Sequence, residues 1–519
     1  MSQKQLKDVL IEGSIKKDPD NIVYSFNGHT LSIYKKSMMM HDDTLFFIGR
    51  DQTGKYLYLV SKSENKKRKI TFNGENLPLN IFGSDIIGER NLLNHENARK
   101  IREFFPFTRP AVIGNIDSFG FGDRLGIANP AHIRSLSGSH MKPVLAQQSV
   151  RELERTQRTA EDVLDAATWA VFQEGYKNGF GADADHLKTT SDIDRYASAG
   201  FTMYTFDPSM YVVNEAVSLP IADVIQRAKQ LEAGEIKYDD VNSRYSNKTV
   251  KLNSNFTLSP DAETVARAFL KYGAVIEHAR KLYRYLKDKY SSINTEVELS
   301  VDETDIPTTP FEHYFVANEL KRLNVKIISL APRFIGDFEK GVDYKGNLQT
   351  FENEYKQHVA ISQLLGPYKI SIHSGSDKFS IYKVIGRIKE GRVHVKTAGT
   401  SYLEALRTIA KVNPNLLREI LDYSKSQYED QRKSYHVTAI IDKVPRGKDC
   451  SDDKLLELFE DHDARQVFHV TFGKVLTERD GKGFLFRDRF MKCLIENEEI
   501  HYQTIIKHFK KHLEPFSHH

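Results

Sequence analysis

The sequence has little of what holds a secreted, membrane or thiolate-based metalloprotein together. Only two cysteines, Cys450 and Cys493, occur in 519 residues and they have no metal-ligand spacing, which argues against a disulfide framework and a thiolate-bound metal. No apolar run approaches membrane-spanning length, and the first residues, MSQKQLKDVLIEG, lack the apolar core of a signal peptide. We therefore expect a cytoplasmic protein without a membrane partner.

A dominant charge of one sign is also missing. The 74 basic and 70 acidic residues nearly cancel, so the electrostatic footprint of a nucleic-acid-binding protein is absent and no nucleic-acid partner is expected. The one dense basic run, residues 66–69, lies between strand-like segments, which is typical of a solvated hairpin tip. The size and ordinary composition instead indicate a large globular enzyme with an accessory domain.

The pattern of the sequence changes near residue 105. Before it, short alternating segments such as NIVYSF and KYLYLVSKS predict a small antiparallel β domain over residues 1–105. After it, apolar strands alternate with long helical stretches. This predicts an α/β catalytic domain over residues 106–519, a TIM-like (β/α)8 barrel with helical insertions. An open doubly wound sheet is the alternative. The strand candidates are residues 110–116, 201–206, 295–301, 325–331, 368–373, 392–397 and 465–472, with weaker ones at 177–183 and 434–440.

Polar residues gather where these strands end. In a barrel, the carboxyl ends of the strands carry the reactive side chains, and strands with a purely structural role would rarely end so consistently in polar residues. The predicted strand ends carry Asp207, Asp302, Glu303, Arg333, His373, Lys396, Thr397, His469 and Thr471.

Two acidic stretches are candidates for proton transfer. In GFGADADHLKT, Asp185 and His186 are adjacent, so one can bind a metal while its neighbour moves a proton; the alternative is an Asp-rich turn with a helix cap. In SVDETDIPTTPFEHYF, Asp302 and Glu303 stand at a strand end as candidate acids or bases. If the strand continues through them, they point to opposite faces and only one of them reaches the site.

The stretch YKISIHSGSDKFSIY raises a similar expectation. Its alternation ends on His373, followed by Ser374, Ser376 and Lys378, which could grip a polyhydroxy acid. A single histidine on one face of a strand is usually a core residue. His394 is presented in the same way on the next strand, which favours a metal site.

Further polar residues are candidates for substrate contacts. Arg333 could clamp a carboxylate through two hydrogen bonds, and Lys396 alternates with apolar residues as His394 does. The stretch GFGDRLGIANPAH lacks the third glycine of a dinucleotide fingerprint, so we exclude nicotinamide binding there. Asp123, Arg124 and His132 in this stretch remain candidates for hydroxyl or carboxylate contacts.

Together these motifs, with SLAPRFIGDFEKGVDY and HVKTAGTSYLEALR, resemble those of the tagaturonate epimerases, also called fructuronate–tagaturonate epimerases, of bacterial hexuronate catabolism. The resemblance covers roughly residues 105 to 480. It implies a cytoplasmic enzyme that interconverts D-fructuronate and D-tagaturonate and depends on a divalent cation, with zinc, manganese, nickel and iron all open. It leaves the oligomeric state undetermined.

The resemblance also implies roles for individual residues. The acid–base pair would be Asp185 and Glu303, and the metal ligands would be His186, His373 and His394, with His469 as the alternative third ligand. The inverted carbon is β to the ketone, so enolisation does not acidify its hydrogen. A retro-aldol cleavage followed by re-addition fits these residues, whereas transient oxidation would need a nicotinamide. A metal-dependent aldolase, a ketose isomerase or a non-catalytic sugar-acid binding protein are the alternatives.

Overall fold

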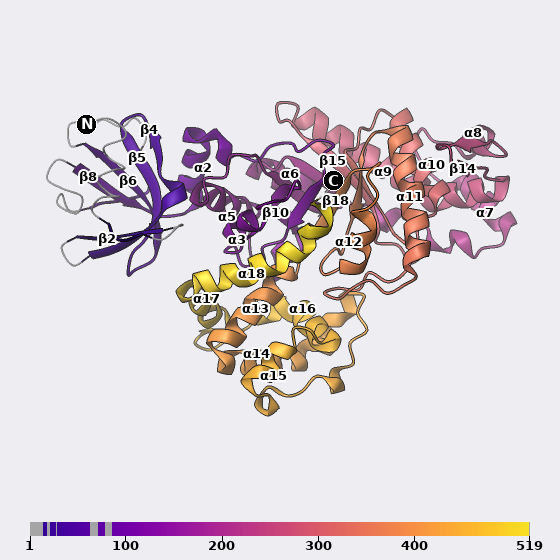
Figure 1. Cartoon of the computed structure of the whole chain (residues 1–519). Helices are drawn as coiled ribbons and strands as arrows, with labels where there is room; N and C mark the ends of the chain where they lie inside the picture. Colours follow the sequence, from indigo (N-terminus) through magenta and orange to yellow (C-terminus); the bar gives the residue numbers. More distant parts are fainter. Residues whose placement is uncertain (1–13, 18–20, 27–28, 63–70, 78–85, 518–519) are drawn as a thin grey trace.

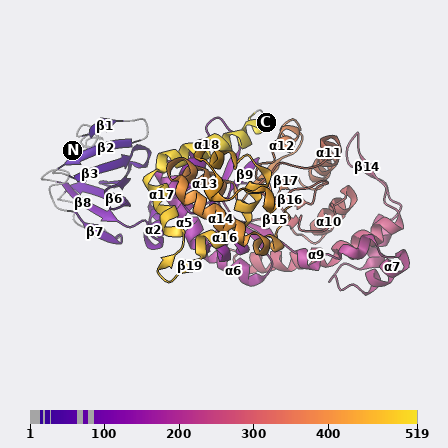
Figure 2. The same cartoon turned by 90° about the horizontal axis from the view of Figure 1, so that it is seen from below.

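The computed structural model describes residues 14–17, 21–26, 29–62, 71–77 and 86–517, and the basic run at 66–69 lies outside them. A closed barrel lies between an N-terminal sheet and a helical insertion, with a layer of C-terminal helices along one side (Figures 1 and 2). Among the described residues, no helix is long and apolar enough to cross a membrane.

The N-terminal residues form the expected antiparallel sheet, in the order β1-β2-β3-β5-β6-β8-β7, with β4 on β5. Apolar residues occupy both faces of its central strands, because one face forms its own core and the other packs on helices α2 and α5. The predicted boundary at residue 105 falls directly after α2. The bounds are β1 (Ser14–Lys17), β2 (Asn21–Phe26), β3 (His29–Tyr34), β4 (Met39–His41), β5 (Thr44–Arg50), β6 (Lys55–Lys62), β7 (Gly74–Asn76), β8 (Ile86–Asn91), α2 (His95–Phe104) and α5 (Ala160–Gln173).

Eight parallel strands close into a barrel, which confirms the predicted fold and excludes the open sheet. The order is β9-β10-β11-β12-β15-β16-β17-β18, and β18 pairs with β9 to close the ring. The bounds are β9 (Ser118–Phe121), β10 (Lys142–Ser149), β11 (Gly181–Leu187), β12 (Met203–Phe206), β15 (Glu296–Val301), β16 (Ser329–Pro332), β17 (Lys369–Ile372) and β18 (Val393–Thr397).

Helices surround the barrel and extend it on two sides. The apolar faces of those next to the strands form one large core with the outward side chains of the strands, and α13 to α17 form a second core of their own. The bounds are α3 (Asn129–Ser135), α4 (Val150–Thr156), α6 (Thr190–Ala199), α7 (Ile221–Gln230), α8 (Tyr238–Tyr245), α9 (Ala262–Lys289), α10 (Pro310–Arg322), α11 (Leu348–Leu365), α12 (Phe379–Ile385), α13 (Thr400–Val412), α14 (Pro414–Gln431), α15 (Asp452–Glu457), α16 (His462–Thr477), α17 (Arg487–Glu496) and α18 (Glu498–Leu513).

The first barrel strand was predicted at the wrong place. Residues 110–116 form a loop rather than a strand, because Gly114 has a φ of 72° and Ile116 is 46% exposed. The amides of Ile113 and Gly114 donate to the carboxylate of Glu296 instead of to a neighbouring strand. The true first strand is β9, hidden in a glycine-rich stretch, and the prediction also missed β10.

The strand predicted at 465–472 is wrong as well. These residues lie inside helix α16, which begins after Asp461, whose side chain accepts the amide hydrogen of Ala464. Most side chains of this helix are buried, so the sequence does not show the polar face of an amphipathic helix. Its pattern resembles that of a fully buried strand instead. Residues 434–440 contain only a 3-10 turn and irregular backbone.

Candidate active site

A cavity opens at the carboxyl ends of the barrel strands. It is lined by residues of β10, β11 and β18 and by the segments that follow β15 and β17, and its volume is about 60 Å³. Acidic and histidine side chains line this cavity together with the cations Arg124, Arg151 and Lys340. We call it the mouth cavity.

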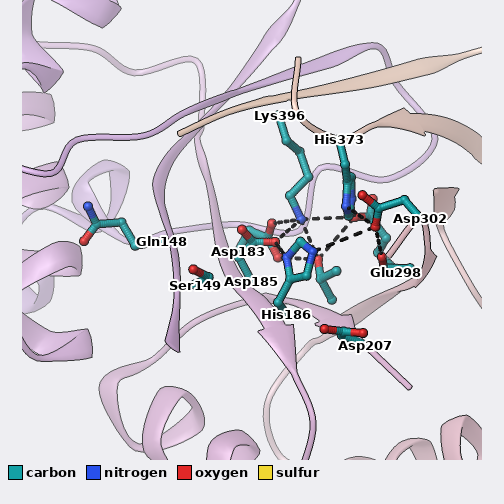
Figure 3. A network of polar contacts seen from close by, with 12 residues as sticks. Gln148, Ser149, Asp183, Asp185, His186, Asp207, Glu298, Asp302, His373 and Lys396 are labelled. Atoms are coloured by element: carbon teal, nitrogen blue, oxygen red, sulfur yellow. Dashed lines mark hydrogen bonds and ion pairs between the residues drawn. The ribbon is translucent and has the colours of Figure 1, made fainter. Parts of the chain in front are cut away.

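A buried lysine is at the centre of the floor of this cavity (Figure 3). The Lys396 ammonium lies 2.6 Å from Asp183 Oδ2, 2.6 Å from Asp185 Oδ1 and 3.1 Å from Glu298 Oε1. It also donates to Thr205 Oγ1 at 2.8 Å. Three carboxylates against one ammonium leave an excess of negative charge inside the barrel, where burial makes uncompensated charge costly.

Two histidines and an aspartate lie just above this network. Asp302 Oδ1 is 3.0 Å from His373 Nδ1 and 3.9 Å from His186 Nε2. Each of the three residues offers a ligand atom, and these atoms lie within 4.8 Å of one another. Two imidazoles and a carboxylate form a donor set that divalent transition ions accept. His186 Nδ1 lies 2.8 Å from Asp185 Oδ1, which fixes the ring and leaves Nε2 on the side of Asp302.

The electrostatics of the site favour positive charge. Burial by itself lowers the pKa of His186, but the carboxylates of Asp185, Glu303 and Asp207 together outweigh it and raise the pKa to about 10. Burial also lowers the pKa of His373, and the charge of Asp302 raises it overall to about 9. Burial raises the pKa of Asp183 to about 6 against the lowering charge of Lys396. The cluster therefore attracts either protons or a cation.

The backbone explains why two adjacent residues of β11 both reach the cavity. Neighbouring strand residues normally point to opposite faces. The pairing of β11 with β12 shifts register between Ala184 and Leu187, and His186 takes a left-handed φ of 57°. Such a bulge redirects a side chain, and strained backbone of this kind concentrates at functional sites.

Asp302 and Glu303 both line the mouth cavity, which corrects the expectation that only one of them would face it. The reason is that β15 ends at Val301, so the alternation of a strand no longer applies to the two carboxylates. The Glu303 side chain is 36% exposed and lies 3.8 Å from Arg151 and 4.0 Å from His186 Nε2. Of the two predicted acid–base residues, it is the less constrained.

Most of the predicted site residues meet in this cavity. The residues Asp185, His186, Glu303, His373, Ser374, Lys396 and Arg124 all line it. Arg333 lines an adjoining cavity that shares Glu303 and Lys340, and its Nη1 donates to the Thr304 carbonyl oxygen.

Two predicted substrate contacts are corrected by their hydrogen bonds. Asp123 accepts the backbone amides of Gly126 and Ala128 at 2.8 Å each, so it shapes a turn. The ammonium of Lys378 is buried and donates to the carbonyl oxygens of Glu339 (2.8 Å), Val342 and Ser376 (3.1 Å). Neither side chain lines the mouth cavity among the described residues, and both organise loops beside it.

The prediction of His394 as a metal ligand is corrected by strand register. His394 pairs with Ser371, two residues below His373 on β17, which places it about 6.6 Å deeper in the barrel. Its Nδ1 lies 2.9 Å from Ser118 Oγ, and burial lowers its pKa to about 3. Asp302 lies beside the two histidines instead. His469, the alternative ligand, lines the cavity from α16 but is outside the group of close ligand atoms.

Several charged residues of the site were not predicted from the sequence. Asp183 and Glu298 could have been found, because each alternates with apolar residues in its strand. Asp183 lies two positions before Asp185 in β11, and Glu298 lies two positions after Glu296 in β15. Arg151 and Lys340 carried no comparable signal, since one begins a helix and the other lies in a loop.

The chain is similar to known proteins along most of its length. Residues 34–516 match the family described as tagaturonate epimerase. A "Tagaturonate/fructuronate epimerase" from Thermotoga maritima is 42% identical over 492 residues, which covers 94% of this chain and 97% of that protein. The chain belongs to the tagaturonate epimerase family. It is therefore an enzyme of the epimerase type.

Solved structures of this family share the whole architecture. The fructuronate-tagaturonate epimerase UxaE from Cohnella laeviribosi, in a crystal structure with one glycerol, is 38% identical with a TM-score of 0.86, covering 93% of this chain and 96% of that chain. Its native crystal structure gives a TM-score of 0.85 and covers 94% and 96%. The similarity thus includes the N-terminal sheet, which carried little of the resemblance seen in the sequence.

Proposed function

We propose that this epimerase interconverts D-fructuronate and D-tagaturonate in the mouth cavity. The observation that carries the proposal is the pairing of a cation-binding cluster with nearby basic residues in one cavity of a chain from this family. His186, His373 and Asp302 supply the cluster, and Arg151 and Lys340 line the same cavity. A keto-hexuronate needs both, because it carries hydroxyl and ketone oxygens at one end and a carboxylate at the other.

The cluster fits a divalent cation by its donor chemistry. His186 is held by Asp185 through Nδ1, and Asp302 lies close to both imidazoles. A bound divalent ion would supply Lewis acidity to substrate oxygens and offset the surplus negative charge of the barrel interior.

The substrate carboxylate fits the part of the cavity that Arg151 and Lys340 line. Lys340 Nζ donates to Ser374 Oγ at 2.6 Å, and Arg151 has no carboxylate closer than Glu303 at 3.8 Å in the described part of the chain. Ser374 is held in a left-handed conformation with φ of 52°, which fixes its hydroxyl beside Lys340. An arginine and a lysine that line the same cavity can each take one oxygen of a carboxylate.

The chemistry we propose is a retro-aldol cleavage followed by an aldol addition. A base takes the hydroxyl proton of carbon 3, the bond from carbon 3 to carbon 4 breaks, and the electron pair moves toward the ketone. This gives an aldehyde and an enediolate. Rotation of the aldehyde and attack on its other face reform the bond, and the proton returns to the new hydroxyl oxygen.

Glu303 and Asp185 are the proposed proton-transfer groups of this reaction. Glu303 lies at the open side, with its carboxylate free of hydrogen bonds to the described residues. Asp185 lies at the floor in contact with the Lys396 ammonium, which can hold a proton next to it. Two groups on different sides of the cavity suit the two hydroxyl orientations that the two epimers present.

Incubation of the metal-loaded protein with D-fructuronate tests the function, with tagaturonate as the expected product. Lasting three-carbon fragments would indicate an aldolase, and an aldose would indicate an isomerase.

Substrate deuterated at carbon 3 tests the chemical route of the epimerisation. The retro-aldol reaction leaves that C–H bond intact, so we expect no primary isotope effect and no loss of label. A primary isotope effect would overturn the retro-aldol route.

A further inference from the structure

A cavity of about 720 Å³ lies between the N-terminal sheet and the barrel, apart from the mouth cavity. Strands β5 and β6 form one side of it, and α5, α17 and α18 contribute to the other; Figure 2 shows α5 and α17 on the side of the barrel that faces the sheet. This volume lies in the range of small-molecule sites, about 300–1,000 Å³. We call it the interdomain cavity.

The acidic groups of the interdomain cavity are already paired. Asp165 accepts from Arg102 at 2.9 Å, and Glu498 lies 3.2 Å from Arg50. The carboxylate of Asp162 accepts a backbone amide at the start of its own helix. Asp165 and Glu498 are therefore already balanced by cations, whereas Asp162 is bound by a backbone amide only.

Two arginines at this cavity lack such a partner. Within the described ranges, neither Arg158 nor Arg487 lies at ion-pair distance from a carboxylate. Arg158 donates only to oxygens that carry no full charge, among them the carbonyl oxygens of Asp123 (2.6 Å) and Asp162 (3.0 Å). The Arg487 guanidinium lies 4.9 Å from the centre of the Phe484 ring. Burial lowers the pKa of Arg158 against the raising charges of Asp123 and Asp162, and the positive charge of Arg487 adds to the lowering.

Two neutral polar groups of the same cavity are also unsatisfied. Trp169 is 7% exposed and His501 is 1% exposed, and both line the cavity. Trp169 Nε1 and His501 Nε2 have no hydrogen-bond partner among the residues that the structure describes. Buried polar atoms without partners are uncommon in native proteins, and a ligand is one of the groups that satisfies them.

We propose that the interdomain cavity is a second ligand site, for a small organic anion whose carboxylate or phosphate group lies between Arg158 and Arg487. Guanidinium groups bind both oxyanions through paired hydrogen bonds. Trp169 Nε1 supplies a donor for another oxygen of the same ligand. The arginines take the charge, while apolar residues such as Leu494 contact the carbon skeleton.

The site shares part of its framework with the mouth cavity. The carbonyl oxygen that accepts from Arg158 belongs to Asp123, and the next residue, Arg124, lines the mouth cavity. An anion that draws Arg158 toward itself pulls on the main chain beside Arg124. We therefore expect occupation of the interdomain cavity to change the KM for the hexuronate, a consequence that rests on the proposed function.

Trp169 makes the binding test specific, because it is the protein's single tryptophan. Inorganic phosphate, phosphoglycolate and glutarate are titrated into the full-length protein while tryptophan emission is followed, with glycerol as the uncharged control. We expect a saturable change with at least one anion and none with glycerol. Phosphoglycolate against glutarate separates phosphate from carboxylate recognition. A response that never saturates with any of the three overturns the proposal.

Two variants of the same helix sharpen the test. Arg487→Gln should weaken the anion at least about tenfold, because it removes a charge-assisted contact. Arg489→Gln is the matched control, since Arg489 lies exposed on α17 and pairs with Glu419. Equal affinity in wild type and Arg487→Gln, or equal loss in both variants, overturns the site. These measurements need no turnover, so they stand apart from the proposed function.

The activity measurement concerns only the link between the two cavities. An anion at its wild-type Kd should shift the KM of the wild type and of Arg489→Gln, and should shift that of Arg487→Gln much less. A KM that shifts equally in all three proteins would show that the anion acts at the mouth cavity itself, and would overturn the link.

Discussion

In the N-terminal sheet and in the barrel, successive side chains of a strand point to opposite faces. The two regions differ in the polarity of the side chains that they bury. In β5, Leu45 and Phe47 lie in one apolar cluster, and Phe46 and Ile48 lie in another. In β17 and the residue after it, Ile370 and Ile372 face the surrounding helices, whereas Lys369, Ser371 and His373 are the inward positions. Barrel interiors are commonly filled by Val, Ile and Leu, so this interior departs from the usual pattern.

The difference shows where the molecule has given up stability for chemistry. Apolar side chains stabilise a sheet simply by leaving water. Buried charges must instead be paired and hydrogen-bonded, and even then an apolar replacement is often no less stable. The barrel interior therefore has a charge network that a purely structural core would not need. Changes in the two regions should accordingly affect different measurements.

The largest expected effect comes from the proposed cation cluster. His186→Ala removes one of three protein ligands, so metal retention and turnover should both fall to background. Metal content by mass spectrometry and the rate with D-fructuronate check this. His140→Ala is the control, because His140 lies exposed in the loop before β10. Full activity of the wild type after chelator treatment would remove the metal from the proposal.

The next effect concerns proton transfer. Glu303→Gln keeps the shape of the side chain but cannot exchange a proton, so turnover should fall by ~10²–10⁴-fold. Metal content and thermal stability should stay nearly unchanged, because the Glu303 side chain is 36% exposed. Asp305→Asn, two residues along the same exposed loop, should keep the rate. Loss of metal from Glu303→Gln would make Glu303 a ligand instead.

A third change tests how strongly the free energy of unfolding depends on the pairing of the buried charges in the barrel. Lys396→Met leaves Asp183, Asp185 and Glu298 without their shared ammonium, and breaking such a buried pair costs about 3–5 kcal/mol. The free energy of unfolding from denaturant titration should fall by this amount. Lys383→Met on α12, where the side chain is exposed, should have little effect. Unchanged stability of Lys396→Met would mean that the carboxylates take up protons and become neutral.

The same alternation explains how far the sequence alone could go. Strands β15, β17 and β18 were recognisable because apolar residues recur at every second position, and some of the polar residues between them, such as Lys396, line the site. The candidate at 177–183 overlapped β11 only at its start. The barrel and its reactive end followed from this pattern. The depth of each polar residue in the barrel did not follow from the pattern. His394 and His373 alternate with apolar residues in the same way, but the stagger of their neighbouring strands places them at different depths.

Residues outside the strands were beyond reach for a different reason. Lys340 and Arg151 reach the cavity through tertiary packing, and a loop lysine has no periodicity to reveal it. Lys378 looked like a substrate contact because only its neighbours along the sequence were visible. In the fold, its ammonium meets carbonyl oxygens of Glu339 and Val342, nearly forty residues away.

The smallest expected effect lies in the other region. Ile33→Val removes one methylene from the apolar face of the N-terminal sheet, where Ile33 is fully buried. The free energy of unfolding should fall by about 0.5–1.5 kcal/mol, measured by denaturant titration of the same transition as for Lys396→Met. The value of kcat should stay unchanged, since Ile33 contacts neither cavity through its own side chain in the described structure. The matched change in the barrel wall, Ile370→Val, should cost a similar amount of stability, because Ile370 is equally buried on the outward face of β17. A fall in kcat for Ile33→Val alone would mean that the packing of the sheet controls the barrel site, and the separation of the two regions would fail.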